Sequence, residues 1–399
     1  MPDIRALSRP YNGAMNPIIE WTEGGWSQRA RWRSEAGVAP HVAIAIGDDR
    51  MSADAAWRLL ESGTALLWRG DWVNARHLLQ ALSRRAERHF GGKRELSPTP
   101  TAAFARYREL QGQRAALLGR LLVAVDAVFR VPLRRAQDIR QACIEAWGPS
   151  DGEGCVVALR ELLAVISAHE WRKKGIPVPA VEGRIYPHYG VFSPVRGEYV
   201  DLVAKAPLPA GCEHAFDIGT GSGILAAVLA RRGIKRVVAT DQDARALQCA
   251  TENARNLGLT AAIEVIEADL FPDGRAPLVV CNPPWVPARP SSPVEYAVYD
   301  PDSRMLRGFL GGLAAHLEPN GEGWLIISDL AEHLGLRSRD ELLGWIAAGG
   351  LQVRGRIDTR PEHPKASDRK DPLHAARAAE VTSLWRLGLA GENISHEPE

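Results

Sequence analysis

The chain has 399 residues, a length that accommodates two domains. An apolar fraction of 45% and a charged fraction of 24% are typical of a soluble globular protein, and a net charge of +1 excludes a global field that would drive it to nucleic acid or membranes. No run reaches the roughly 18 apolar residues of a membrane-spanning helix, and the first residues lack the apolar stretch of a signal peptide, so we expect a cytoplasmic protein.

Cysteines and charges narrow the class further. The five cysteines are scattered without a C-x-x-C pair, which argues against zinc ribbons and disulfide frameworks, and we expect no metal. Residues 1–180 carry 26 Lys and Arg against 19 Asp and Glu, and residues 84–140 carry 13 against 5. This basic excess fits either a surface for an acidic macromolecule or solvated helix faces.

Residues 1–175 are predicted to form a mostly helical N-terminal domain whose first 49 residues are irregular. Ser52 and Asp71 stand where N-cap residues precede apolar helical patterns. A Pro- and Gly-rich stretch at 176–200 predicts a linker. The helices expected before it span 52–70, 71–92, 108–129 and 155–175.

Residues 201–390 alternate between strand and helix patterns. This alternation predicts an α/β domain with a Rossmann-like, mostly parallel seven-stranded sheet and helices on both faces. Ligands of such sheets bind beyond the carboxyl ends of the strands. The expected strands are 214–219, 236–241, 261–268, 276–281, 322–328, 351–358 and 380–387, and the expected helices are 222–233, 243–258, 303–317 and 337–350.

A glycine-rich loop, FDIGTGSG at 216–223, follows the first of these strands. Gly219, Gly221 and Gly223 permit a sharp turn and let the backbone approach a ligand closely. Thr220 lies between the first two glycines and is expected to border the same ligand. The spacing does not meet the dinucleotide pattern G-x-G-x-x-G. Asp217 at the strand end would repel a pyrophosphate but attract an ammonium group.

Two further acids follow the next two strands. Asp241 ends the second strand, where a carboxylate accepts hydrogen bonds from both ribose hydroxyls. Asp269 follows the third strand and can accept from an adenine amine, while Leu270 or Phe271 packs on the ring. Each acid alone would suit a helix cap or a solvated loop. Together with the loop, the three predict a pocket for S-adenosyl-L-methionine.

These motifs carry a family resemblance. FDIGTGSG, ATDQD, EADLF and CNPPW occur in the order and near the spacing of class I S-adenosylmethionine-dependent methyltransferases, over residues from about 185 to 386. The chain is similar to the branch that includes the protein glutamine N-methyltransferases of release factors, and to N6-adenine-type enzymes. Segments 191–203, with Pro194 and Glu198, and 299–306 also resemble the release-factor branch. For residues 1–175 the similarity is only architectural.

The resemblance implies a role for the NPPW corner after the fourth strand. In the family, this loop holds a planar amine or amide. The Asn282 oxygen and the Pro283 carbonyl would each accept one hydrogen of an NH2 group, which directs the nitrogen lone pair at the methyl group, and Asn282 would also border the cofactor. Pro284 rigidifies the corner, and Trp285 would stack on the planar group. Without the preceding pocket, Pro-Pro would indicate only a strand end.

The expected activity is therefore N-methylation of a planar amine or amide by S-adenosyl-L-methionine, in a protein glutamine or a nucleic-acid base. A small-molecule acceptor is the first alternative, and a nicotinamide-dependent oxidoreductase a more distant one. Trp285 stands where release-factor enzymes carry Tyr, which leaves the glutamine assignment open. The charged segment 360–380 is long enough to shape a substrate site of its own.

Overall fold

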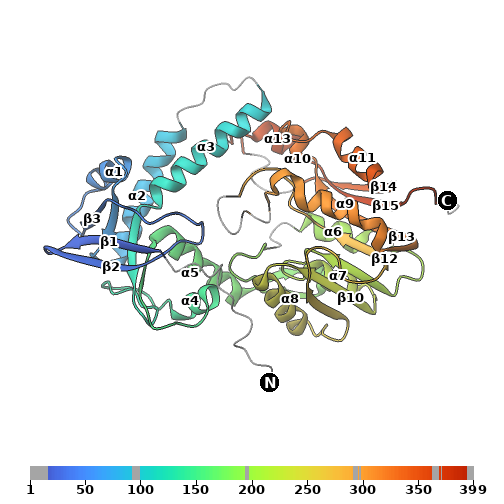
Figure 1. The fold of residues 1–399 in the computed structure, drawn as a ribbon, viewed down its shortest axis with the longest axis horizontal. Helices are drawn as coiled ribbons and strands as arrows, with labels where there is room; N and C mark the ends of the chain where they lie inside the picture. The colour runs from blue at the N-terminus through green and yellow to red at the C-terminus, as the bar shows by residue number, and fades with distance from the viewer. Residues whose placement is uncertain are drawn as a thin grey trace. The chain divides into compact units, whose positions relative to one another are not determined.

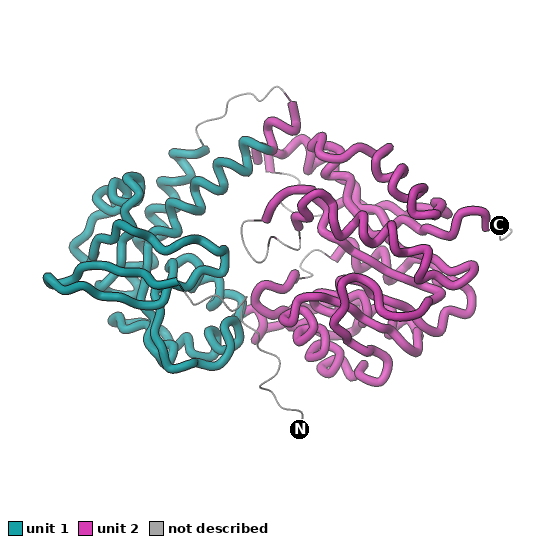
Figure 2. The backbone as a smooth tube through the Cα atoms, in the orientation of Figure 1, with its two compact units in different colours: residues 1–97, 105–170 teal, residues 98–104, 171–399 magenta. Residues whose placement is uncertain are grey.

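The computed structural model describes residues 17–91, 99–193, 197–290, 295, 298–361, 368–369 and 371–392. The chain divides into two compact units (Figure 2). Unit 1 comprises Met1–Ser97 and Ala105–Glu170, and unit 2 comprises Pro98–Phe104 and Trp171–Glu399.

Unit 1 contains a six-stranded mixed sheet in the order β1-β2-β6-β5-β4-β3, of which Figure 1 labels β1, β2 and β3. Helical side chains and one face of the central strands form a large apolar cluster, whereas the opposite face carries a smaller cluster made by strands alone. The elements with all or most of their residues in unit 1 are β1 (Ile18–Glu23), β2 (Trp26–Arg33), β3 (Ile44–Gly47), α1 (Ala53–Glu61), β4 (Ala65–Trp68), α2 (Trp72–Gly91), α3 (Pro100–Leu118), β5 (Leu121–Val125), α4 (Arg140–Trp147), β6 (Cys155–Ala158) and α5 (Leu159–Lys174).

The prediction of a mostly helical domain with an irregular start missed this sheet. The expected helix 52–70 ends at Glu61 and continues as β4, the expected helix 108–129 ends at Leu118 before β5, and the expected helix 155–175 begins as β6. Nearly every residue of these three strands is buried. Such strands are apolar runs without alternation, which periodicity does not separate from a buried helix.

Unit 2 contains a seven-stranded sheet in the order β11-β10-β9-β12-β13-β15-β14. Neighbours from β11 to β13 are parallel, and β15 is antiparallel to both β13 and β14. The predicted mostly parallel, seven-stranded α/β sheet is thereby confirmed. Its strands are β9 (His214–Ile218), β10 (Arg236–Asp241), β11 (Ile263–Glu267), β12 (Ala276–Cys281), β13 (Leu317–Ser328), β14 (Leu351–Thr359) and β15 (Thr382–Leu389).

Helices cover both faces of this sheet because its strands are apolar on both sides. Ala215 and Leu278 belong to one cluster with α6, α7 and α8, whereas their neighbours Phe216 and Val279 belong to a second cluster with α9 and α11. This is the two-residue alternation of a strand buried on both faces. The helices are α6 (Glu198–Lys205), α7 (Ile224–Arg231), α8 (Ala244–Asn256), η4 (Pro301–Ser303), α9 (Arg304–His316), α10 (Leu330–His333), α11 (Arg339–Ala348) and α13 (His374–Ala379).

The stretch 176–200, predicted as a linker, lies within unit 2. It contains a two-stranded antiparallel sheet of β7 (Ile176–Val178) and β8 (Gly183–Ile185), joined by η2 (Pro179–Val181), and the start of α6. Its apolar residues are buried in the cluster with α7. The prolines and glycines therefore shape turns of a packed hairpin.

Within the described ranges, none of the helices combines the length and apolar character needed to cross a bilayer. The same residues contain no group of three or more His, Cys, Asp or Glu side chains placed to hold a metal ion. All five cysteines are unbridged.

A buried ion pair joins β13 and β15 and gives a test of the sheet. The Glu322 carboxylate accepts from Arg386 Nε at 2.8 Å and Nη2 at 2.6 Å, and from Trp324 Nε1 at 2.9 Å. We expect Arg386→Met to lower the free energy of unfolding by about 3 kcal/mol, because it leaves a buried carboxylate without its cation. The control is Arg236→Met, whose pair with Glu264 is exposed, with an expected loss below about 1 kcal/mol. If urea denaturation gives the two variants equal losses in free energy of unfolding, the stabilising role of the pair between Glu322 and Arg386 is contradicted.

Candidate functional site

The glycine loop joins β9 to α7 through three residues in the left-handed region. Gly219, Gly221 and Gly223 have φ values of +69°, +55° and +79°. A Cβ on Gly219 would collide with the Met305 side chain, and one on Gly223 would lie 3.0 Å from Ala250 Cα. A Cβ on Gly221 would meet no atom within 4 Å. The loop therefore packs closely at both ends and leaves its middle open for a ligand to approach the backbone.

Asp217 lies at the carboxyl end of β9 and is 1% exposed. Its Oδ2 accepts from Thr220 Oγ1 at 2.6 Å and from the Ala226 backbone N–H at 3.0 Å. Burial raises the pKa of this carboxyl to about 6, against the lowering effect of those two hydrogen bonds. Asp217 thus fixes the turn from the loop into α7. The predicted contact with an ammonium group stays a prediction.

Asp241 ends β10 and connects two turns. Its Oδ2 accepts from the Gly221 N–H and its Oδ1 from the Asp243 N–H, each at 3.0 Å. Burial raises the pKa of Asp241, and these backbone donors oppose that change. Because each carboxylate oxygen accepts two hydrogen bonds, capacity remains for a pair of hydroxyls. Asp243 caps α8 by accepting from the Arg245 N–H at 2.8 Å.

The residues after β11 differ in their surroundings. Asp269 is exposed and pairs with Arg304 at 3.1 Å. Leu270 has φ +78°, and its carbonyl accepts from Thr240 Oγ1 at 2.6 Å. Phe271 packs into the core on α9, where its ring is stacked on His316 with centroids 4.4 Å apart. Phe271 is therefore held by the protein core, whereas Asp269 lies at the surface.

The NPPW corner follows β12 directly. Pro283 is buried, and Asn282, Pro284 and Trp285 are partly buried. Trp285 packs against both core clusters of unit 2, and its Nε1–H donates to Asn282 Oδ1 at 2.9 Å. The Asn282 oxygen predicted to hold an acceptor NH2 group therefore already accepts one hydrogen bond, and its second lone pair remains.

The segment after the corner carries backbone strain. The Val286 N–H donates to the Val298 carbonyl, and Asp300 N–H donates to the Val286 carbonyl at 2.9 Å. Asp300 is 6% exposed and accepts from the first N–H groups of α9. Asp302 and Ser303, with φ +56° and +52°, adopt the left-handed region without being glycine. Strain of this kind occurs where surrounding structure fixes a functional segment.

Sequence reasoning missed a buried link between the loop and the preceding hairpin. Asn253 on α8 is 1% exposed; it donates to the Ser222 carbonyl at 2.9 Å and accepts from the Tyr186 N–H at 2.8 Å. Beside it, Glu252 accepts from His188 and Arg172. The signal for Asn253 was a polar residue on the buried face of an amphipathic helix.

Two other predicted segments have partial outcomes. Pro194 lies outside the described residues, and Glu198 begins α6 next to the buried Tyr199. Residues 362–367 and 370 of the 360–380 segment also lie outside the described residues. At its end, Glu380 is 4% exposed and accepts from Ser328 Oγ at 2.7 Å, a contact that anchors the chain before β15.

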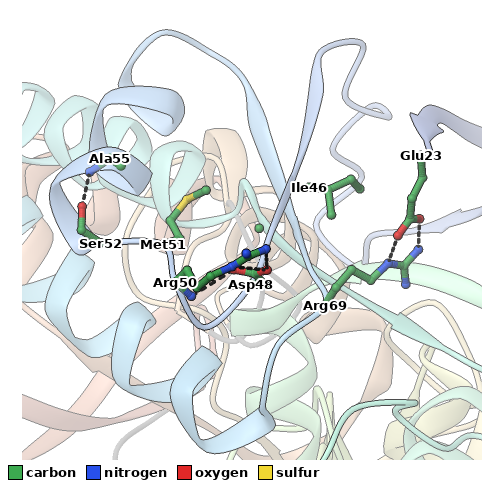
Figure 3. Close-up of a pocket in the computed structure, with 9 residues that line it drawn as sticks. Glu23, Ile46, Asp48, Arg50, Met51, Ser52, Ala55 and Arg69 are labelled. Atoms are coloured by element: carbon green, nitrogen blue, oxygen red, sulfur yellow. Dashed lines mark hydrogen bonds and ion pairs between the residues drawn. The ribbon is translucent and has the colours of Figure 1, made fainter. Parts of the chain in front are cut away.

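A cavity of about 530 Å³ lies in unit 1, at the carboxyl ends of β3 and β4 (Figure 3). Two arginines line it, and both are paired: Arg50 with Asp48 and Arg69 with Glu23. None of the residues predicted for the site lines this cavity. We therefore assign it no part in the chemistry of unit 2.

Comparison with known proteins shows a family similarity in unit 2. Residues 207–283, which include the loop, Asp241, Asp269 and Asn282, match the family described as Ribosomal protein L11 methyltransferase (PrmA). Unit 2 is therefore similar to class I S-adenosylmethionine-dependent methyltransferases. A ribosomal protein L11 methyltransferase of Pelotomaculum thermopropionicum is 42% identical over 83 residues, 20% of this chain and 26% of the relative. A release factor glutamine methyltransferase of Cereibacter sphaeroides is 30% identical over 177 residues, 41% of this chain and 58% of the relative.

The chain thus spans less than two thirds of the length of either relative. Among solved structures, a ribosomal protein L11 methylase of Lactobacillus delbrueckii subsp. bulgaricus has 19% identity and a TM-score of 0.34, covering 48% of this chain and 77% of its own. The match to the L11 family ends at Pro283. The resemblance predicted from the motifs is thereby confirmed over residues 207–283, while the role of the NPPW corner stays a prediction.

Asp217 gives a pH test of the site's scaffold. Its pKa is about 6 in the folded protein and 3.8 in an unfolded chain, so its contribution to stability is full below about pH 4 and is lost as the pH rises through 6. Asp217→Asn removes the titration and keeps an oxygen for Thr220 and Ala226. We expect the variant to gain on the order of 2–3 kcal/mol relative to wild type between pH 4 and pH 7. If the free energies of unfolding of wild type and Asp217→Asn, measured by urea denaturation, change with pH in parallel, the raised pKa of Asp217 is wrong.

Proposed function

We propose that unit 2 transfers a methyl group from S-adenosyl-L-methionine to the nitrogen of a planar amide or amine in a protein. The observation that carries the proposal is the register of β9 and β12. Ile218 pairs with Cys281 in these parallel neighbours, so the glycine loop and the NPPW corner leave the sheet side by side at the same level. A donor held by the loop and an acceptor held by the corner would meet there.

Asp241 and the loop are the groups that would hold the methyl donor. The spare lone pairs of Asp241 suit ribose hydroxyls, and the open side of Gly221 lets a ligand reach the backbone. Asp217, Thr220 and Gly223 maintain the loop, and Asp269 or Leu270 would border the adenine. When bound, S-adenosyl-L-methionine supplies an electrophilic methyl group on a sulfonium.

Asn282 and Pro283 would orient the acceptor. The free lone pair of Asn282 Oδ1 and the Pro283 carbonyl each accept one N–H hydrogen, which sets the nitrogen lone pair toward the donor. Both oxygens would also stabilise the positive charge that develops on the nitrogen as its bond to the methyl carbon forms and the bond from that carbon to the sulfonium sulfur breaks. The N–H proton then leaves to solvent, and neither a nucleophilic side chain nor a metal is needed for this step.

A protein acceptor is favoured by the relatives, whose names specify a ribosomal protein and release factors. The family of L11 methyltransferases matches the part of unit 2 that contains the loop. Transfer to a nucleic-acid base or a small molecule would be a different outcome of the labelling experiment below.

Asp241→Ala tests the donor site. We expect the dissociation constant for S-adenosyl-L-methionine, measured by calorimetry, to rise about tenfold or more, because two hydroxyl contacts and the anchor of Gly221 are lost. The matched control is Asp243→Ala, which removes a helix cap nearby and should leave the constant within about twofold. An unchanged constant in Asp241→Ala would overturn the assignment.

The acceptor site is tested by incubating the protein with methyl-labelled S-adenosyl-L-methionine and separated protein, RNA, DNA and small-molecule fractions. We expect label in the protein fraction. Asn282→Ala should lower turnover about 100-fold or more while the dissociation constant of the donor stays within about twofold, because the contact acts on the acceptor. Label in another fraction would replace the protein assignment, and full activity of Asn282→Ala would remove the clamp.

A further inference from the structure

The hydrogen bond between Trp285 and Asn282 restricts the amide to one orientation. The indole N–H donates only, so its 2.9 Å contact requires the oxygen of Asn282 rather than its NH2 group. A 180° flip of the amide would place two donors against each other. Trp285 thereby selects the orientation in which Asn282 presents an acceptor, and a phenylalanine ring at this position could not do so.

The indole itself is held from two sides. Its ring packs against the apolar clusters on both faces of the sheet. The backbone carbonyl of Trp285 accepts a hydrogen bond from Arg337 Nη1 at 3.4 Å. Arg337 lies between α10 and α11 and is therefore placed by elements that follow β13.

Arg337 is an unusual residue for a core. Arg337 is only 3% exposed, and its Nε and Nη2 atoms have no hydrogen-bond partner among the described residues. Burial lowers the pKa of Arg337, while the charges of Glu332, Glu341 and Asp300 oppose this change and Arg339 adds to it. A buried cation with incomplete hydrogen bonding is less stable than an apolar side chain of similar size. Its presence at the corner therefore indicates a task other than stability.

We propose that Arg337 is a positioning residue for methyl transfer, and this inference rests on the function proposed above. Arg337 fixes the Trp285 carbonyl, the fixed Trp285 indole orients Asn282, and Asn282 presents its second lone pair to the acceptor N–H. Arg337 itself touches neither donor nor acceptor. It acts through Trp285, so the two residues form one chain of contacts.

The experiment combines transfer kinetics with nuclear magnetic resonance of the full chain. Arg337→Met, Trp285→Phe and the double variant are compared with wild type, and Arg339→Met is the matched control because Arg339 pairs with Glu332. With ¹⁵N-labelled tryptophan, the Trp285 indole signal among the 12 tryptophans is identified by its loss in Trp285→Phe. We expect this signal to move in Arg337→Met and to stay in place in Arg339→Met.

In the kinetic measurement, we expect each single variant to lower turnover about 10- to 100-fold with the dissociation constant of the donor within about twofold. The double variant should show no further loss, because both substitutions break the same chain of contacts. Arg337→Met should also keep the unfolding temperature of wild type or raise it. If Arg337 only supported the fold, Arg337→Met would lower the unfolding temperature and weaken donor binding.

Failure of this inference is distinguishable from failure of the proposed function. An indole signal that does not move in Arg337→Met, or multiplicative losses in the double variant, would overturn the positioning role even if transfer is observed. Absence of transfer by wild type in every fraction would overturn the proposed function, and the indole signal would still decide whether Arg337 fixes Trp285.

Discussion

The parallel pairing of β9 with β12 is the constraint on which the site depends. Because Ile218 lies opposite Cys281, the chain must leave both strands at the same end of the sheet, and the glycine loop and the NPPW corner share the space beyond it. The crossing helices α7 and α9 then start from that edge, α7 after the glycine loop and α9 after the strained turn at Asp302 and Ser303. In this sheet, the parallel pairing of β9 with β12 is the reason that we expect ligands beyond the carboxyl ends of the strands.

The polar groups at this edge serve mainly to hold the backbone. Asp217 ties its loop to the start of α7, and Asp300 does the same for α9. Asp241 connects the loop to the turn before α8, and Asn253 connects the loop to the hairpin of β7 and β8. A loop fixed in this way is preorganised, so ligand binding does not have to pay for ordering it. Arg337 extends the same principle to the corner, at some cost in stability.

Much of unit 2 could be predicted from its sequence because local signals agreed. Apolar runs ended at glycines or acids, and strands and helices alternated with the lengths of an α/β unit. The contacts of the acids could not be predicted: spacing placed Asp217 and Asp241 at strand ends but did not show that backbone donors occupy their oxygens. Phe271 could not be separated from a ring-stacking residue, because an aromatic after a strand suits either a ligand or a core.

Unit 1 resisted prediction for another physical reason. Its strands β4, β5 and β6 are four or five residues long and buried, and each adjoins a helix of similar composition. Two contacts of the NPPW corner also could not be predicted. The hydrogen bond between Trp285 and Asn282 depends on side-chain rotamers, and the contact between Arg337 and Trp285 joins positions 52 residues apart.

The most direct test of the account is an experimental structure with S-adenosylhomocysteine bound. We expect both ribose hydroxyls to lie within hydrogen-bonding distance of Asp241, the homocysteine part to follow the glycine loop, and the sulfur to face the NPPW corner. A ligand bound elsewhere, or one whose sulfur points away from Asn282, would contradict it.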